Sequence, residues 1–166
     1  MENKQKNVFI SHYGKDDADV QKLRQLMNRH GYNLRNASID STKSNNAAND
    51  HYIKYGLLRP GINWAGTVIV LIGDETHTRE WVNWEIEQAA KLGTRVVGVY
   101  INELKQGDPP LPEAFTNFAS ALVGWTGNRI VDAIEGDINN FQKPDSTPFP
   151  KYLGFIKVNL LKMKKK

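Results

Sequence analysis

The residue pair best suited to chemistry is Trp81 and Glu85, which lie in the run Trp-Val-Asn-Trp-Glu-Ile-Glu-Gln-Ala over 81–89. Residues four apart lie one turn apart on the same face of a helix, so Trp81 can form a wall beside the Glu85 carboxylate. Such a wall offers a stacking surface for a flat ring and excludes water, which strengthens the attraction between the carboxylate and a developing positive charge. The spacing also suits a solvated helix glutamate that pairs with Lys91 or Arg79.

Two other side chains of this run are expected to play simpler roles. Glu87 stands two positions after Glu85 and points to a different side of the helix, which makes it the matched control carboxylate. Trp84 is expected to pack in the core or at an interface, because large aromatic side chains contribute mainly apolar burial.

Further candidates for ligand contact stand at or near the ends of two apolar runs, 8–10 and 95–101. The carboxyl ends of parallel strands meet at one edge of a sheet, where α/β proteins bind their ligands. Helix capping or loop packing is the alternative for His12 and Tyr13, and a place in the core is the alternative for mid-strand Phe9. With the helix tryptophan included, the candidate binding residues are Phe9, Ser11, His12, Tyr13, Trp81 and Asn102.

Short apolar runs predict the strands that must position these residues. Three of them, 8–10, 67–72 and 95–101, are rich in β-branched and aromatic residues, and 32–39 is a weaker fourth. Apolar runs without polar alternation suit a parallel sheet that helices cover on both faces.

Helical patterns occupy the segments between these strands, at about 16–30, about 47–59, 79–92 and 128–141. Gly31 and the pair Pro60-Gly61 are the predicted stops of the first two. The segment 102–119 is expected to be a long loop, and 143–150, with three prolines, to lead away from the sheet. Alternating strands and helices predict a flavodoxin-like, doubly wound α/β sandwich with a mostly parallel central sheet and helices on both faces.

Composition removes several classes of chemistry. The 166 residues include no cysteine, which excludes thiolate nucleophiles, redox pairs and cysteine-based zinc sites. The four histidines are scattered without a metal-binding spacing, so no metal site is predicted. No glycine-rich phosphate loop follows a strand. The lysines at positions 162, 164, 165 and 166 equal the whole net charge of +4, so the body is neutral and nucleic acid is not an expected partner.

Four segments occur in an informative order: Val-Phe-Ile-Ser-His-Tyr at 8–13, Val-Leu-Ile-Gly at 70–73, the helix run at 81–89, and Val-Gly-Val-Tyr-Ile-Asn at 97–102. Together they resemble a TIR domain, and in particular the TIR-like branch of the bacterial Thoeris anti-phage system. The resemblance covers about 8–102, and its most specific element is the strand end at 71–73 followed by the helix at 81–86.

The resemblance implies an enzyme that cleaves NAD+, an NAD+ glycohydrolase or ADP-ribosyl cyclase, with Glu85 matching the catalytic glutamate and Trp81 the family's tryptophan. NAD+ is then the substrate, and no separate cofactor is expected. The implied product is a cyclic ADP-ribose isomer or a related ADP-ribosyl messenger that activates a separate effector in anti-phage defence. Self-association involving the segment 38–46 and a phage-derived trigger are further implications.

Two other functions remain open from the sequence. One is a non-catalytic TIR module that works through protein–protein contacts, although many such adaptors lack a glutamate at the position of Glu85. The other is a receiver-like phosphoacceptor that would use Asp16, Asp17 and Asp74. Against the receiver, Asp16 and Asp17 suit the start of a helix, and no lysine ends a later strand as a phosphoryl partner.

Domain organisation and location complete the expectations. Residues 1–142 are predicted to form the TIR-like domain, and 143–166 a C-terminal extension with a basic tail that packs on or trails the same domain. The amino-terminal residues lack the apolar stretch of a signal peptide, and no apolar run is long enough to cross a bilayer. A cytoplasmic protein without membrane contacts is therefore expected.

Overall fold

A parallel sheet forms the centre of the computed structural model, which describes residues 4–37, 56 and 58–149. Its five strands run in the order β2-β1-β3-β4-β5, and each neighbouring pair is parallel. Every residue of the central strand β3 is buried, as expected when helices cover both faces. The strands are β1 (Lys4–Ser11), β2 (Tyr32–Asn36), β3 (Thr67–Ile72), β4 (Arg95–Tyr100) and β5 (Ala121–Val123).

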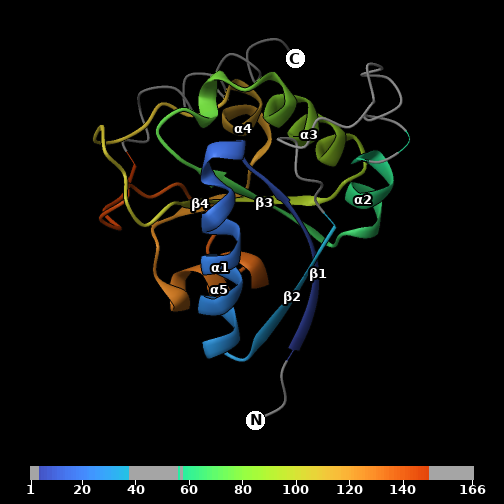
Figure 1. Cartoon of the computed structure of the whole chain (residues 1–166), viewed down its shortest axis with the longest axis horizontal. Coiled ribbons are helices and arrows are strands. Elements are labelled where there is room, and N and C mark those ends of the chain that lie inside the picture. Colours follow the sequence, from blue (N-terminus) through green and yellow to red (C-terminus); the bar gives the residue numbers. More distant parts are fainter. Residues whose placement is uncertain (1–3, 38–55, 57, 150–166) are drawn as a thin grey trace, which may run out of the picture.

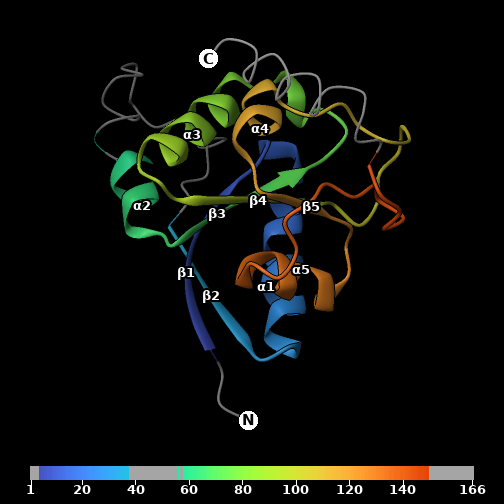
Figure 2. The ribbon, with the colours of Figure 1, turned by 180° about the vertical axis from the view of Figure 1, so that it is seen from behind.

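Helices lie on both faces of this sheet: α1 (Asp17–Arg29), α2 (Arg59–Trp64), α3 (Glu80–Lys91), α4 (Glu113–Phe118) and α5 (Gly127–Glu135), with short 3-10 turns η1 (Gly14–Asp16) and η3 (Thr76–Thr78). Helices α1 and α5 cover one face, whereas α2, α3 and α4 cover the other (Figure 1; Figure 2). The arrangement confirms the predicted flavodoxin-like, doubly wound α/β fold. Across the described ranges, no helix is long and apolar enough to span a membrane.

Side chains of β1 alternate between the two layers of the core. Val8 and Ile10 belong to the cluster that contains the apolar faces of α1 and α5. Phe9 belongs to the opposite cluster, with Ile62 of α2 and Ile86 of α3, and it is 0% exposed. The structure therefore places Phe9 in the core.

Several element boundaries differ from the predicted ones. The stretch 102–119, predicted to be a loop, contains α4, and the helix predicted to reach position 141 ends at Glu135. Gly136 stops it with a left-handed φ of 90°. Pro60 lies in the first turn of α2 instead of closing a helix. Proline is tolerated in a first turn because the N–H group that it lacks would have no partner within the helix there. Most of the helix predicted at 47–59 lies outside the described residues.

The segment after α5 returns to the sheet, so the prediction that it leads away is wrong for 143–149. Phe141 forms a β-bridge with Leu122 of β5, and Gln142 forms another with Pro148. The rings of Phe141 and Phe149 pack edge to face, with centroids 6.3 Å apart. The first bridge attaches the segment to β5, and the second bridge and the aromatic contact fold 143–149 back onto Phe141 and Gln142. The remainder of the predicted extension, 150–166, lies outside the described residues.

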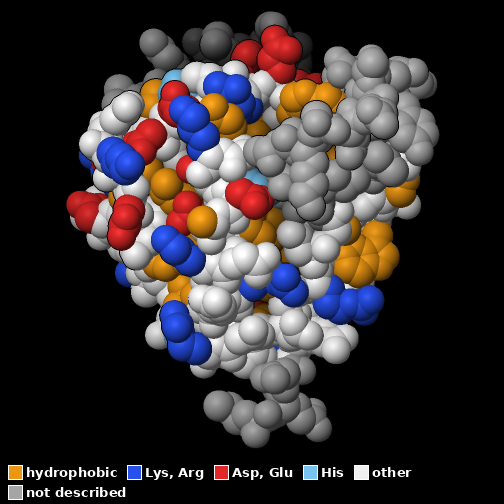
Figure 3. All heavy atoms as spheres, in the orientation of Figure 1, with side chains coloured by type: hydrophobic (Ala, Val, Ile, Leu, Met, Phe, Trp, Pro, Cys, Tyr) orange, Lys and Arg blue, Asp and Glu red, His pale blue; other side chains and the backbone are white. Residues whose placement is uncertain are grey.

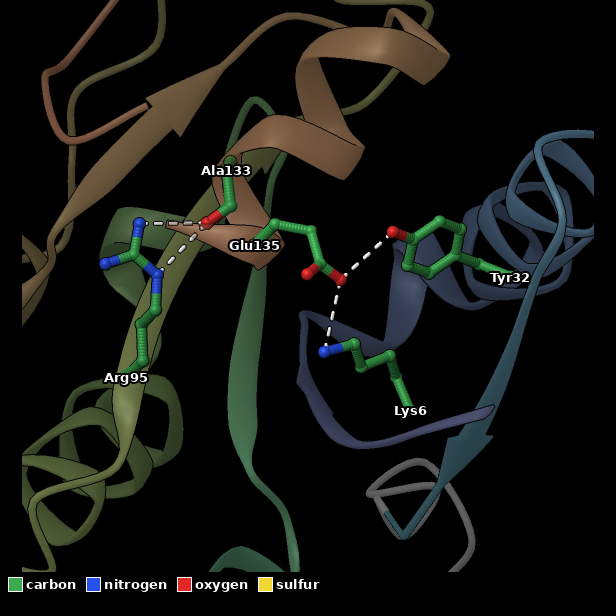
Figure 4. Close-up of polar contacts among 5 residues, drawn as sticks. All are labelled: Lys6, Tyr32, Arg95, Ala133 and Glu135. Carbon is green, nitrogen blue, oxygen red and sulfur yellow. Dashed lines mark hydrogen bonds and ion pairs between the residues drawn. The ribbon is translucent and has the colours of Figure 1, made fainter. Parts of the chain in front are cut away.

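The amino edge of the sheet is tied to the end of α5 (Figure 4). The Glu135 carboxylate accepts a hydrogen bond from the Tyr32 hydroxyl at 3.0 Å and pairs with Lys6 Nζ at 3.1 Å. Arg95 donates to the Ala133 carbonyl from Nε at 3.0 Å and from Nη2 at 2.8 Å. One helix end thus holds β1, β2 and β4 in place, and the carboxyl edge is left for binding a ligand.

Candidate active site

A tight turn between β3 and α3 sets the direction of the helix that carries Glu85. Thr76 Oγ1 accepts a hydrogen bond from the Gly73 N–H at 2.8 Å and donates one to the Leu71 carbonyl at 3.2 Å. Val82 and Ile86 of α3 are then buried in the core beneath the helix. Because these two positions face the core, the Glu85 side chain between them is also brought inward.

Glu85 meets the carboxyl end of β1. Ser11 Oγ donates a hydrogen bond to Glu85 Oε1 at 2.7 Å, although the two residues are 74 positions apart in the chain. Glu85 is only 8% exposed and Ser11 1%. No ion pair involves Glu85 within the described part of the chain. The side chain is therefore a buried carboxyl group held by a hydroxyl, and not the solvated glutamate of the alternative interpretation.

Burial changes the acidity of this group. Loss of hydration raises the pKa of Glu85 from 4.5 to about 8, while the hydrogen bond from Ser11 opposes this change by favouring the carboxylate. A carboxyl group with a pKa near neutrality exchanges between its neutral and charged forms in the range where enzymes work. Such a perturbed acid at the carboxyl edge of an α/β sheet is a typical functional-site candidate.

The face of α3 around Glu85 combines aromatic and amide side chains. Trp81 lies one turn before Glu85, is partly buried and packs on the α2–α3 side of the core; its role as a wall beside Glu85 stays a prediction. Trp84 packs against the same cluster. Gln88, one turn after Glu85, is 3% exposed and was missed by the sequence reasoning. Its three-residue spacing from Glu85 was the available signal, because i,i+3 neighbours share a helix face.

His12, which follows β1 and was predicted to contact a ligand, is held by two contacts within the chain. His12 Nδ1 lies 3.1 Å from the Ile10 carbonyl, and Nε2 lies 3.0 Å from Asp17 Oδ1. Both ring nitrogens are thus engaged within the chain, and the buried His12 ring joins β1 to the start of α1. This geometry agrees with the loop-packing alternative.

Tyr13 and Asn102 remain closer to solvent. The Tyr13 ring is partly buried and lies under the Arg79 guanidinium, with 3.9 Å between the guanidinium carbon and the ring centroid. Asn102 follows β4 and is exposed, and among the described residues no hydrogen bond joins it to Ser11 or Glu85. The structure thus brings Ser11 and Glu85 together and stacks Tyr13 on Arg79, which was not among the predicted binding residues.

On the face shown in Figure 3, acidic side chains lie beside lysine and arginine side chains. The acidic residues of the receiver hypothesis follow the carboxyl ends of β1 and β3 in the chain. Burial, reinforced by Asp19, raises the pKa of Asp16 to about 6. Asp16 Oδ2 is buried close to Gly73, and it has no hydrogen-bond partner among the residues that the structure describes. The Asp74 carboxylate accepts hydrogen bonds from the backbone N–H groups of Lys105 and Gln106 at 3.1 Å. Asp74 thus anchors the loop after β4. Within the described ranges, no three acidic or histidine side chains are placed to hold a metal ion.

Comparison with known proteins gives one match that spans most of this site. The family model described as Thoeris protein ThsB, TIR-like domain, matches residues 9–106, a range that contains Ser11, Trp81 and Glu85. A protein of Bacillus cereus (strain MSX-D12) named "Putative cyclic ADP-D-ribose synthase ThsB1" is 37% identical over 49 residues. This match covers 30% of the chain and 26% of that protein, so it spans about a quarter of the relative's length.

A solved structure, a 2-deoxyribosyltransferase from Bacillus psychrosaccharolyticus, is also similar. It has a TM-score of 0.49 and 15% sequence identity, over 74% of this chain and 88% of the other. A likeness of this degree carries no argument about function. The family match covers more than half of the chain, including the strands and the helix that hold the Ser11–Glu85 pair. The chain therefore belongs to the family of Thoeris ThsB TIR-like domains.

Proposed function

We propose that this protein cleaves the bond between nicotinamide and ribose in NAD+ and transfers the ADP-ribosyl group to water or to an atom of the same molecule. The product, ADP-ribose or a cyclic isomer, would activate a separate effector during phage infection. The observation that carries the proposal is the buried Glu85 carboxyl held by Ser11. The ThsB-like family and the name of the Bacillus cereus relative point to the same chemistry.

One carboxylate is sufficient for this reaction. Most glycosidases use two because the leaving oxygen must be protonated, whereas the nicotinamide of NAD+ is already cationic. When the C1′–N bond breaks, its electron pair stays with the nicotinamide nitrogen, which leaves neutral. The ribose becomes oxocarbenium-like, and a fixed carboxylate in a dry site stabilises that positive charge. The nucleophile then forms its bond to C1′ and releases a proton.

The environment of Glu85 suits a cationic substrate. Burial by itself favours the neutral form of the carboxyl group, with its pKa near 8. A positive charge brought next to this group favours the carboxylate and lowers the pKa. Binding NAD+ would therefore generate the charge that the transition state needs. NAD+ acts here as a substrate, and the scheme needs no resident cofactor.

A purely adaptor function gives no reason for this burial. A buried carboxyl group lowers stability when it ionises, and a protein that only assembles gains nothing from it. Self-association remains part of the proposal, although the segment 38–46, predicted to contribute to assembly, lies outside the described residues. A cytoplasmic location, where NAD+ and phage components are both present, is also proposed.

The test is release of nicotinamide from NAD+ by the purified protein, with and without lysate from phage-infected cells. Glu85→Gln keeps the shape of the side chain and removes its charge, so it should abolish release. Glu87→Gln, on the exposed side of the same helix, is the control and should retain full activity. Equal release by wild type and Glu85→Gln would refute the proposal.

A further inference from the structure

Arg79 is held in a defined position at the start of α3. Its guanidinium carbon lies 3.9 Å from the centroid of the Tyr13 ring, close enough for a cation–π contact. Its Nε donates a hydrogen bond to Thr78 Oγ1 at 3.0 Å. The stacking and the hydrogen bond together fix the plane of the guanidinium, so little rotational freedom is left to lose when a ligand binds.

The outer nitrogens of Arg79 are available. In the described part of the chain, no carboxylate pairs with Arg79, and no hydrogen bond from Nη1 or Nη2 is formed. Among the described residues the adjacent Glu80 forms no ion pair with Arg79. Asp17 meets His12, and Glu75 pairs with Lys15 at 3.4 Å. A pre-oriented guanidinium without an acidic partner is suited to bind an anion from outside the chain.

Arg79 and Glu85 both contact residues at the carboxyl end of β1. Arg79 directly precedes α3 and stands six positions before Glu85, a rise of about 9 Å along the helix. Two contacts connect the end of β1 to α3, Ser11 with Glu85 and Tyr13 with Arg79. Because Tyr13 is only two residues after Ser11, the Arg79 guanidinium and the Glu85 carboxyl group lie along the same edge of the sheet.

We infer that Arg79 binds the pyrophosphate of a dinucleotide substrate, with Tyr13 as the residue that orients it. The inference rests on the proposed function, because Glu85 defines where the ribose lies. In NAD+ the pyrophosphate is separated from C1′ of the ribose by only a few bonds. A guanidinium fork matches two phosphate oxygens. Arg79 is itself the N-cap residue of α3, and its side chain makes no capping hydrogen bond to the first turn of the helix, where backbone N–H groups favour anions.

Calorimetric binding of ADP-ribose tests this inference without turnover, since ADP-ribose keeps the pyrophosphate and lacks nicotinamide. Arg79→Ala should weaken ADP-ribose binding about ten- to a hundredfold, and Arg79→Lys should restore only part of the loss. Tyr13→Leu, which keeps the charge and removes the ring, should cause a smaller loss. Lys91→Ala removes a positive charge at the exposed far end of α3 and should change nothing.

Nicotinamide riboside, which has no phosphate, provides the second arm of the test. Its affinity should be the same in wild type and Arg79→Ala. Unchanged ADP-ribose affinity in Arg79→Ala, an equal loss for nicotinamide riboside, or a wild type that does not bind ADP-ribose would each overturn the inference. Failure of the proposed function would look different, because ADP-ribose would bind through Arg79 while NAD+ stayed uncleaved.

Discussion

Replacing Glu85 with glutamine should stabilise the protein at high pH. The folded-state pKa of Glu85 is about 8, against 4.5 for the unperturbed group. Between these values the folded state holds a proton that the unfolded state has released, so stability falls as the pH rises through this window. Each pH unit costs about 1.4 kcal/mol, and the full window therefore costs about 5 kcal/mol above pH 8. This figure is an upper bound, because water that enters the site solvates the carboxylate in part.

The amide introduced by Glu85→Gln does not titrate, and its oxygen can still accept the hydrogen bond from Ser11. The free energy of unfolding should thus be similar for wild type and Glu85→Gln at pH 5 and differ by several kcal/mol in favour of the variant at pH 9. Urea denaturation at pH 5, 7 and 9 measures this difference. The raised pKa of Asp16 acts in the same direction, but it is common to both proteins and cancels.

The matched control is Glu87→Gln, whose carboxylate is exposed. Its unfolding free energy should follow that of wild type at every pH. A difference between wild type and Glu85→Gln that does not change with pH would refute the reasoning, as would a variant that is less stable than wild type at pH 9.

Three further predictions concern the site and the core. The kcat/KM for NAD+ should increase with pH, with the midpoint of the increase near pH 8, because the reaction needs ionised Glu85. A kcat/KM that does not change with pH would contradict this role. Ser11→Ala removes the hydrogen bond that favours the carboxylate, so it should move that midpoint upward and reduce kcat/KM at pH 7 about tenfold, whereas Ser11→Thr keeps a hydroxyl and should restore activity. Gly98→Ala should cost about 1–3 kcal/mol of stability in thermal denaturation, because a Cβ in β4 would collide with Phe115 and Leu122; an unchanged melting temperature would argue against this packing.

Much of the fold could be predicted because its strongest elements carry their own signals. The strands β3 and β4 are continuous apolar runs, as expected for strands buried on both faces. By contrast, β5 has only three residues, and α4 follows a stretch that contains several prolines. Elements this short depend on packing against the rest of the protein, which local sequence patterns do not contain.

The candidate site was predictable in part for a similar reason. The four-residue spacing of Trp81 and Glu85 places them on one helix face, and the structure has this arrangement. The contact of Ser11 with Glu85 joins positions 74 apart, and it depends on how α3 crosses the end of β1. The engagement of both His12 nitrogens is likewise a property of the folded loop. Sequence spacing shows which residues share an element, whereas pairing between elements follows from the tertiary structure.

The most direct test of NAD+ cleavage through Glu85 is mass spectrometry of nucleotides from cells that express wild type, Glu85→Gln or Glu87→Gln, with and without phage infection. We expect wild type and Glu87→Gln to lower NAD+ and to release nicotinamide together with ADP-ribose or a cyclic isomer of it. Glu85→Gln, expressed at the same level, should leave the nucleotides unchanged. The same nicotinamide release in cells that express Glu85→Gln would contradict the central claim that this carboxylate drives the cleavage of NAD+.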